Sequence, residues 1–192
     1  MINIGIVVEG LDDYTTYPTL IQRIRNDIGR SQVRECGGKS RLKNRFVGFL
    51  KEFQNPAWQI GIALVIRDSD CNPPQPIEDQ LRQVLNSCGF RPQFRVEIFA
   101  IPCMLESWLV SDLNAIRQVA AQRRHVGEIE NLHFQIPNGH SPTDKELFSR
   151  VLSHFGLRAT PAVYQEIATI ANFDLIGERC TYFREFVRRI TA

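Results

Sequence analysis

The segment from Ile62 to Asp70 constrains the fold more than any other part of the chain. Five consecutive aliphatic residues, Ile62 to Ile66, are typical of a strand that is buried on both faces inside a parallel sheet. Asp68 and Asp70 follow with one residue between them, so an extended chain points both carboxylates to the same side. The two prolines at 73 and 74 then stop the strand. The sequence predicts a buried strand that ends in a pair of carboxylates.

Three more strands and three intervening helices are expected around this one. Strands are predicted over 3–8, 31–36 and 94–101, and helices over 14–28, from the Gly37-Gly38-Lys39-Ser40 turn to Phe53, and over 76–89. Strands that alternate with helices in this way indicate an α/β fold with a Rossmann-like parallel sheet of about four strands flanked by helices. Glu9 follows the first strand, and right-handed crossovers would bring it to the same sheet edge as Asp68 and Asp70.

The chain after the fourth strand is predicted to be helical. We expect an α/β domain over 1–112 and a helical C-terminal part over 113–192, packed on the first domain or continuous with it as one structural unit. Ser141-Pro142-Thr143-Asp144 and Thr160-Pro161 are helix starts, and a last helix is expected from about Glu178. Residues 125–139 are interpreted as a loop or insertion.

Composition describes an ordinary globular protein. The 192 residues are 43% hydrophobic and 23% charged, with a net charge of +2, so any basic surface for nucleic acid must be local. Five scattered cysteines without a C-x-x-C pair argue against a disulfide framework or a zinc ribbon, and fit the cytoplasm. The N-terminus lacks signal-peptide features, and no apolar run approaches the ~20 residues of a membrane span.

Paired carboxylates at a sheet edge repel each other, and a divalent cation between them removes that cost. Hard oxygen ligands suit Mg²⁺ or Mn²⁺, and open α/β sheets bind ligands at the carboxyl ends of their strands. The structural alternative for Asp68 and Asp70 is a turn and helix-capping pair. Further candidates are Glu106 and Asp112; they too have structural alternatives, as a charge near a helix start and as an N-cap.

The arrangement of these residues resembles the TOPRIM fold. The resemblance is carried by Val8-Glu9-Gly10 after the first strand and by Asp68-x-Asp70 after the third. The segment from Leu105 to Asp112 resembles the E-x-W-L-x-x-D motif of a family of small uncharacterised bacterial TOPRIM-like proteins, related to nucleases of the overcoming-lysogenization-defect type. The family's C-terminal pattern is echoed in Lys145 and in the residues from Cys180 to Phe186. The likeness spans most of the chain.

The resemblance implies a Mg²⁺-dependent or Mn²⁺-dependent nuclease. In that family Glu9 would act as metal ligand or general base, Asp68 and Asp70 as ligands, and Lys145 would neutralise transition-state charge. Asp13 is the favoured additional ligand on its spacing from Glu9, although the chain departs from the VEG-x-T-E/D pattern there. The resemblance also associates the chain with an anti-phage or mobile-element system and a partner ATPase.

A cationic helix face offers a contact for nucleic acid. The basic residues of the second helix could touch phosphates, and their structural alternative is a solvated surface: Lys39, Arg41, Lys43 and Arg45. Gly37-Gly38-Lys39-Ser40 is not a phosphate loop of an NTPase, because Val33 occupies the place of its first glycine. Two other functions stay open: a non-catalytic nucleic-acid-binding or regulatory partner, and phosphoryl chemistry on a small nucleotide.

Overall fold

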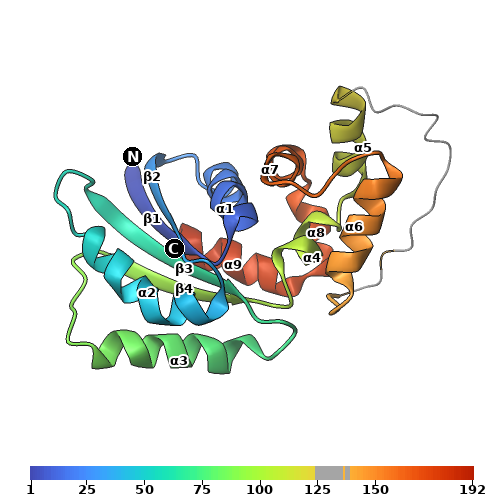
Figure 1. The fold of residues 1–192 in the computed structure, drawn as a ribbon. Coiled ribbons are helices and arrows are strands. Elements are labelled where there is room, and N and C mark those ends of the chain that lie inside the picture. The colour runs from blue at the N-terminus through green and yellow to red at the C-terminus, as the bar shows by residue number, and fades with distance from the viewer. Residues whose placement is uncertain (124–135, 137–138) are drawn as a thin grey trace.

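The fold is a three-layer α/β arrangement extended by a group of helices at one end of the sheet (Figure 1). The computed structural model describes residues 1–123, 136 and 139–192. Its elements are β1 (Ile2–Val8), α1 (Leu11–Ile24), β2 (Ile28–Glu35), α2 (Lys39–Glu52), β3 (Ile60–Asp68), α3 (Pro74–Ser87), β4 (Arg95–Ile101), α4 (Leu105–Leu109), α5 (Leu113–Gln122), α6 (Asp144–His154), α7 (Pro161–Ile170), α8 (Phe173–Arg179) and α9 (Thr181–Thr191).

The four strands form one parallel sheet in the order β2-β1-β3-β4. This confirms the predicted α/β class and the parallel sheet of about four strands. The register places Val8 opposite Glu35, and Asp68 opposite Ile101, so the strands end near one another. All four carboxyl ends therefore open toward the same side of the molecule.

The sheet is buried on both faces because its side chains alternate between two hydrophobic cores. One face packs on α2 and α3 through a small core that includes Phe46, Leu50 and Leu81. The other face packs on α1 and α9, and its core continues without a break into α4–α8. The C-terminal helices thus share a core with the sheet.

Three boundaries differ from those predicted from the sequence. Helix α1 begins at Leu11 rather than Tyr14, because the Asp13 carboxylate accepts the Gly10 amide hydrogen at 3.0 Å and fixes the first turn early. Strand β2 begins at Ile28, opposite Ile2, whereas the helix predicted over 14–28 would have included this residue. The last helix, predicted from about Glu178, begins at Thr181, since the extended backbone of Cys180 separates α9 from α8, which was not predicted.

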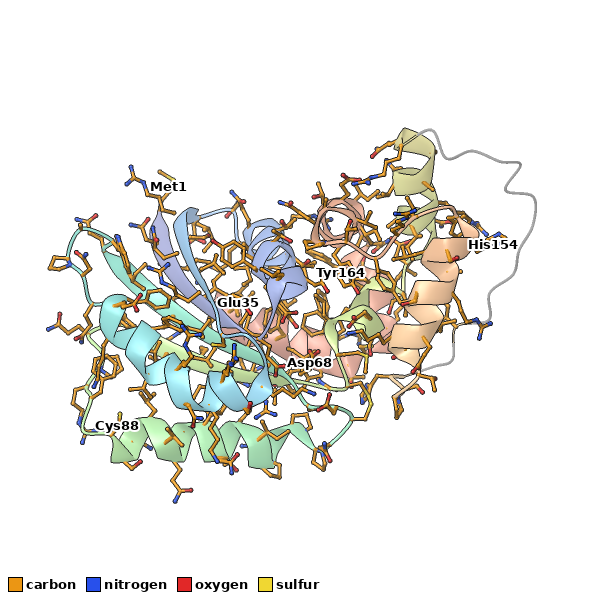
Figure 2. The ribbon with its side chains drawn as sticks, in the orientation of Figure 1. Met1, Glu35, Asp68, Cys88, His154 and Tyr164 are labelled. Atoms are coloured by element: carbon orange, nitrogen blue, oxygen red, sulfur yellow. A yellow bond between two sulfur atoms is a disulfide. The ribbon has the colours of Figure 1, made fainter. Side chains whose placement is uncertain are left out.

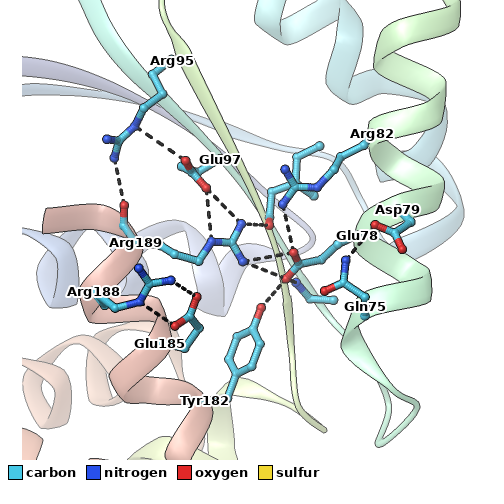
Figure 3. A network of polar contacts seen from close by, with 12 residues as sticks. Gln75, Glu78, Asp79, Arg82, Arg95, Glu97, Tyr182, Glu185, Arg188 and Arg189 are labelled. Carbon is cyan, nitrogen blue, oxygen red and sulfur yellow. Dashed lines mark hydrogen bonds and ion pairs between the residues drawn. The ribbon is translucent and has the colours of Figure 1, made fainter. Parts of the chain in front are cut away.

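A polar network holds α9 against the sheet (Figure 3). The Arg189 guanidinium donates to Glu78 of α3 and Glu97 of β4, at 3.0 Å to each carboxylate, and it stacks on the Phe99 ring. The Glu78 carboxylate, which is 3% exposed, also accepts hydrogen bonds from the Tyr182 hydroxyl and from the Ala100 amide. A buried ion pair of this kind fixes the position of the helix.

Two other predictions from the sequence concern the start of α7 and a loop. Thr160 accepts the Val163 amide hydrogen and begins α7, as predicted. The predicted loop over 125–139 lies almost entirely outside the described residues. Among the residues that the structure describes, none of the helices combines the length and the apolar character that a membrane span requires.

Candidate functional site

A polar cavity of about 240 Å³ lies where the carboxyl ends of the strands meet the C-terminal helices. Figure 2 shows Glu35, Asp68 and Tyr164 converging on this region from three different parts of the chain. Six carboxylates line it: Glu9, Asp12, Asp13, Glu35, Asp68 and Glu106. Ligands of open α/β sheets bind at this position.

Glu9 and Asp68 meet because they end two neighbouring parallel strands. The Asp68 amide donates to Oε1 of Glu9 at 3.2 Å. The Arg67 guanidinium lies 3.6 Å from the same oxygen, and both Glu9 and Arg67 are mostly buried. The sheet topology thus joins two residues that are 59 positions apart in sequence.

The turn after β2 closes around the backbone of Glu9. The amides of Gly37 and Gly38 donate to the Glu9 carbonyl at 3.0 and 2.9 Å. Both glycines have positive φ angles, +80° and +111°, a backbone conformation that side chains disfavour. The turn directs the N-terminus of α2 toward the cavity.

The far wall of the cavity comes from the C-terminal helices. Glu106 of α4 is 4% exposed; its Oε1 accepts the Tyr164 hydroxyl at 2.9 Å and lies 3.4 Å from Nζ of Lys145. Tyr164 belongs to α7 and Lys145 to α6, so three separate helices build this wall. Lys145 is largely exposed and leans over a buried carboxylate.

Crowding of the carboxylates raises their proton affinity. Burial is the main cause that raises the pKa of Asp13 to about 7, and the nearby Glu9, Glu106 and Asp12 add to it. Burial also raises the pKa of Asp68 well above its usual range, followed by repulsion from Asp13 and Glu9. The pKa of Glu9 is raised by burial, against the opposing pull of Lys39 and Arg67. A site of this kind favours a cation.

The carboxylate oxygens that line the cavity are the kind of ligand that a hard divalent cation prefers. Within the described part of the chain, however, no group of three or more His, Cys, Asp or Glu side chains is arranged so that it could hold a metal ion. Glu9 is paired with Arg67, and Glu106 with Lys145. The donors gather in one cavity, but protein cations and backbone amides engage them.

Asp70 and Lys39 lie beside the cavity and not in its lining. Their side chains form an ion pair, with Asp70 about half exposed. The backbone of Asp70 has a positive φ of 51°, which ends the extended conformation on which its predicted alignment with Asp68 depended. Asp70 is therefore the member of the pair that does not line the cavity.

Cys71 and Cys103 form a disulfide between the loops that follow β3 and β4. The scattered cysteines did not predict it, because the two positions become neighbours only through the pairing of those strands. Ser69 and Asp70 donate backbone hydrogen bonds to Ile101 and Cys103 across the same junction. The loop that carries the acidic strand end is therefore held by its neighbour.

Asp112 does not line the cavity, contrary to its assignment as a metal ligand. Its carboxylate caps α5 by accepting the amide hydrogens of Asn114 and Ala115, and it also accepts that of Asn172 at 2.8 Å. These three hydrogen bonds account for its burial. The structural alternative, an N-cap, describes this residue.

The predicted basic residues lie along the first half of α2. Arg41 folds toward Gly37 at the rim of the cavity, where a Cβ on that glycine would lie 2.9 Å from the guanidinium. Arg45 donates to the Cys36 carbonyl and stacks on Phe49, while Lys43 is half-buried. Lys39 and Arg41 are thus nearer to the carboxylates than the other two.

Two residues at the site could not be assigned from the sequence. The sequence favours a packing or surface role for Tyr164, yet Tyr164 lines the cavity and its hydroxyl donates to Glu106. The sequence favours the same role for Tyr17, which is 1% exposed and whose hydroxyl has no hydrogen-bond partner among the described residues. No local pattern marks either residue, because both roles depend on contacts made by distant segments.

Comparison with known proteins adds no relative. No family model, curated protein or solved structure matches this chain. The site must therefore be interpreted from its own geometry.

A second cavity, of about 610 Å³, is larger but has a different character. It lies between α1, α8 and α9, and its lining includes Arg23, Phe173 and Arg184. Arg23 already donates to the carbonyls of Ala168 and Ala171 and stacks on Phe173. We place the functional site in the smaller cavity, because the convergent carboxylates are there.

Proposed function

We propose that this protein is a TOPRIM-like nuclease that hydrolyses phosphodiester bonds of nucleic acid with Mg²⁺ or Mn²⁺. The observation that carries the proposal is the convergence of Glu9, Asp13, Asp68 and Glu106 at the carboxyl edge of a parallel sheet. Burial raises the pKa values of Glu9, Asp13 and Asp68, and repulsion from neighbouring carboxylates adds to it at Asp13 and Asp68, as is typical of a site that receives positive charge.

The residues of the site divide the work of phosphodiester hydrolysis. Glu9, Asp13 and Asp68 would hold the cation, which when bound polarises a phosphoryl oxygen and lowers the pKa of water. Glu9 or Glu106 would accept a proton from the attacking water. The water oxygen then bonds to phosphorus, and the bond between phosphorus and the leaving oxygen breaks. Lys145, released from Glu106, neutralises charge on the phosphoryl group.

The ion pairs at the site set a condition on this proposal. Arg67 must leave Glu9, and Lys145 must leave Glu106, for the carboxylates to converge on a cation. Substrate phosphates are suitable new partners for both cations. We infer that metal and nucleic acid bind together rather than independently.

A cleavage assay with a matched control tests the proposal. Purified protein is incubated with plasmid, single-stranded DNA and RNA in Mg²⁺ or Mn²⁺, beside Asp68→Asn and Asp79→Asn. Asp79 is an exposed aspartate of α3 whose carboxylate accepts a hydrogen bond from Gln75. We expect cleavage by the wild type and by Asp79→Asn, and a loss of at least 100-fold in Asp68→Asn. Cleavage that survives Asp68→Asn would contradict the assigned site.

A second function is favoured by one observation. The carboxylates at this edge already have protein cations as partners: Glu9 with Arg67, Asp70 with Lys39, and Glu106 with Lys145. A module that kept the fold and lost turnover would show such neutralisation and would bind nucleic acid, or a partner ATPase, without cleaving. Nucleic-acid binding without cleavage by the wild type in either metal would support this function over the nuclease.

A further inference from the structure

The carboxylates lie at the bottom of a small cavity. Glu106 is 4% exposed and the Glu9 side chain 12%. The cavity volume of about 240 Å³ is below the ~300–1,000 Å³ of typical small-molecule pockets. A duplex must be deformed, at a cost in free energy, before one of its phosphodiesters can enter such a depression. The backbone of an unpaired strand can enter it without that cost.

Two exposed apolar side chains lie in the first turns of α1, which begins at this cavity. Leu11 lines the cavity and is 67% exposed, and Tyr14, about one helical turn later, is 42% exposed. Large exposed hydrophobic side chains are few among the described residues, and the others are Met1 and Leu175. An apolar and aromatic pair on the helix that carries Asp12 and Asp13 is a platform on which a flat, apolar group can stack.

Cations complete the surroundings. Lys145 has 65% of its side chain exposed at one wall, and Lys39 has 35% exposed beside the N-terminus of α2. Arg41 is exposed and lies against Gly37, which lines the cavity. A polyanion with flat apolar side groups matches both the cations and the platform. Single-stranded nucleic acid has this chemistry, because its bases are free to stack on aromatic side chains.

We propose that the substrate is a single strand, bound with a phosphodiester over the carboxylates and an unpaired base stacked on Tyr14 and Leu11. The place of the phosphodiester over the carboxylates rests on the cation of the proposed function, whereas the preference for an unpaired strand rests on the platform. In a duplex every base is already stacked and paired, so the platform has nothing to bind.

Binding measurements without turnover test this proposal. Fluorescence anisotropy is recorded in Ca²⁺, a hard cation used here in place of Mg²⁺. The probes are a labelled 12-mer single strand, the same strand with abasic residues, and the blunt duplex of the same sequence. We expect the single strand to bind at least tenfold more tightly than the duplex and than the abasic strand.

Variants separate stacking from charge. Base–aromatic stacking predicts that Tyr14→Ala weakens binding of the single strand by about 5- to 150-fold, and that Tyr14→Phe stays within about twofold of the wild type. Tyr14→Ala should leave the weaker binding of the abasic strand unchanged. Leu175→Ala, at an exposed apolar position of α8, is the control and should have no effect. Thermal melting checks that each variant is folded.

The possible outcomes distinguish this inference from the nuclease proposal. The inference would be overturned if the duplex bound as tightly as the single strand or more tightly. It would also be overturned if Tyr14→Ala weakened binding of the intact and the abasic single strand equally, or if no probe bound. Cleavage that requires Asp68 but acts on duplexes would overturn it and leave the nuclease in place. Single-strand binding that depends on Tyr14, without cleavage in Mg²⁺ or Mn²⁺, would support it and remove the nuclease.

Discussion

Tyr17 shows how a single residue links the site to the stability of the fold. Its ring packs edge-on against Trp108 in the main core, but its hydroxyl has no hydrogen-bond partner among the described residues. The carboxylates of Asp68, Asp13, Glu106 and Glu9 add to burial in raising its pKa well above the usual range. A buried polar group without a partner is costly.

We predict that Tyr17→Phe raises the free energy of unfolding. Removing a hydroxyl without a partner should stabilise the protein by about 1 kcal/mol. Tyr164→Phe is the matched comparison, and it should destabilise by about 1 kcal/mol because its hydroxyl donates to the buried Glu106. Urea denaturation of both variants in metal-free buffer measures the two changes. Destabilisation by Tyr17→Phe would mean that its hydroxyl does have a partner.

The raised carboxylate pKa values predict how stability depends on pH. Asp13 has a folded-state pKa of about 7 against an ordinary value of 3.8, so the folded protein holds its proton more tightly than the unfolded chain does. Its contribution is therefore fully present below about pH 4 and is lost as the pH rises to about 7. We expect Asp13→Asn to flatten the pH dependence of the free energy of unfolding in this window, as measured by urea titrations between about pH 4 and 7.

Metal should reverse this dependence. Because ligand carboxylates must lose their protons, Mn²⁺ should raise the melting temperature of the protein mixed with a short single strand more at pH 8 than at pH 6. Samples treated with EDTA, and therefore free of metal, are the reference at each pH. If the rise in melting temperature were the same at both pH values, Mn²⁺ would not bind the carboxylates whose pKa values are raised.

At the residue scale, a role could be predicted from the sequence only where it follows from local patterns or from strand topology. Glu9 and Asp68 could be paired because strand topology alone brings strand ends together. Tyr164 and Tyr17 could not be assigned, since their settings come from helices whose packing no local pattern encodes. Asp70 was placed by extrapolating an extended backbone through a residue that adopts a positive φ.

At the scale of elements, α9 depends on one ion-pair network. Arg189 is 14% exposed and bridges Glu78 and Glu97, whereas its neighbour Arg188 is 69% exposed and pairs with Glu185 on the same helix. We predict that Arg189→Ala destabilises the protein by about 3 kcal/mol, because it removes the most buried cation of the network and leaves Glu78 with only the more exposed Arg82. Arg188→Ala should leave the free energy of unfolding almost unchanged, because its ion pair with Glu185 is exposed to solvent.

Guanidinium chloride denaturation followed by circular dichroism measures both arginine variants. Equal effects of the two substitutions would contradict the role assigned to the network. The sequence could not predict this network, because it joins α3, β4 and α9 across more than 90 positions. The strands and their neighbouring helices could be predicted, since hydrophobic periodicity is local.

At the scale of the whole molecule, the site lies at the meeting of the sheet with the C-terminal helices. Glu9, Asp13 and Asp68 come from the α/β part, and Glu106, Lys145 and Tyr164 from helices that follow β4. Dividing the chain near residue 112 would separate Lys145 and Tyr164 from Glu9. The function proposed here therefore belongs to the chain as a unit.

The most direct test of the metal site is diffraction from crystals grown with Mn²⁺ and a short single strand. We predict an anomalous difference peak in contact with Asp68 and with Glu9 or Asp13, and Lys145 moved from Glu106 toward a phosphate. Crystals in which Mn²⁺ binds elsewhere, while Arg67 still pairs with Glu9 and Lys145 with Glu106, would contradict the account.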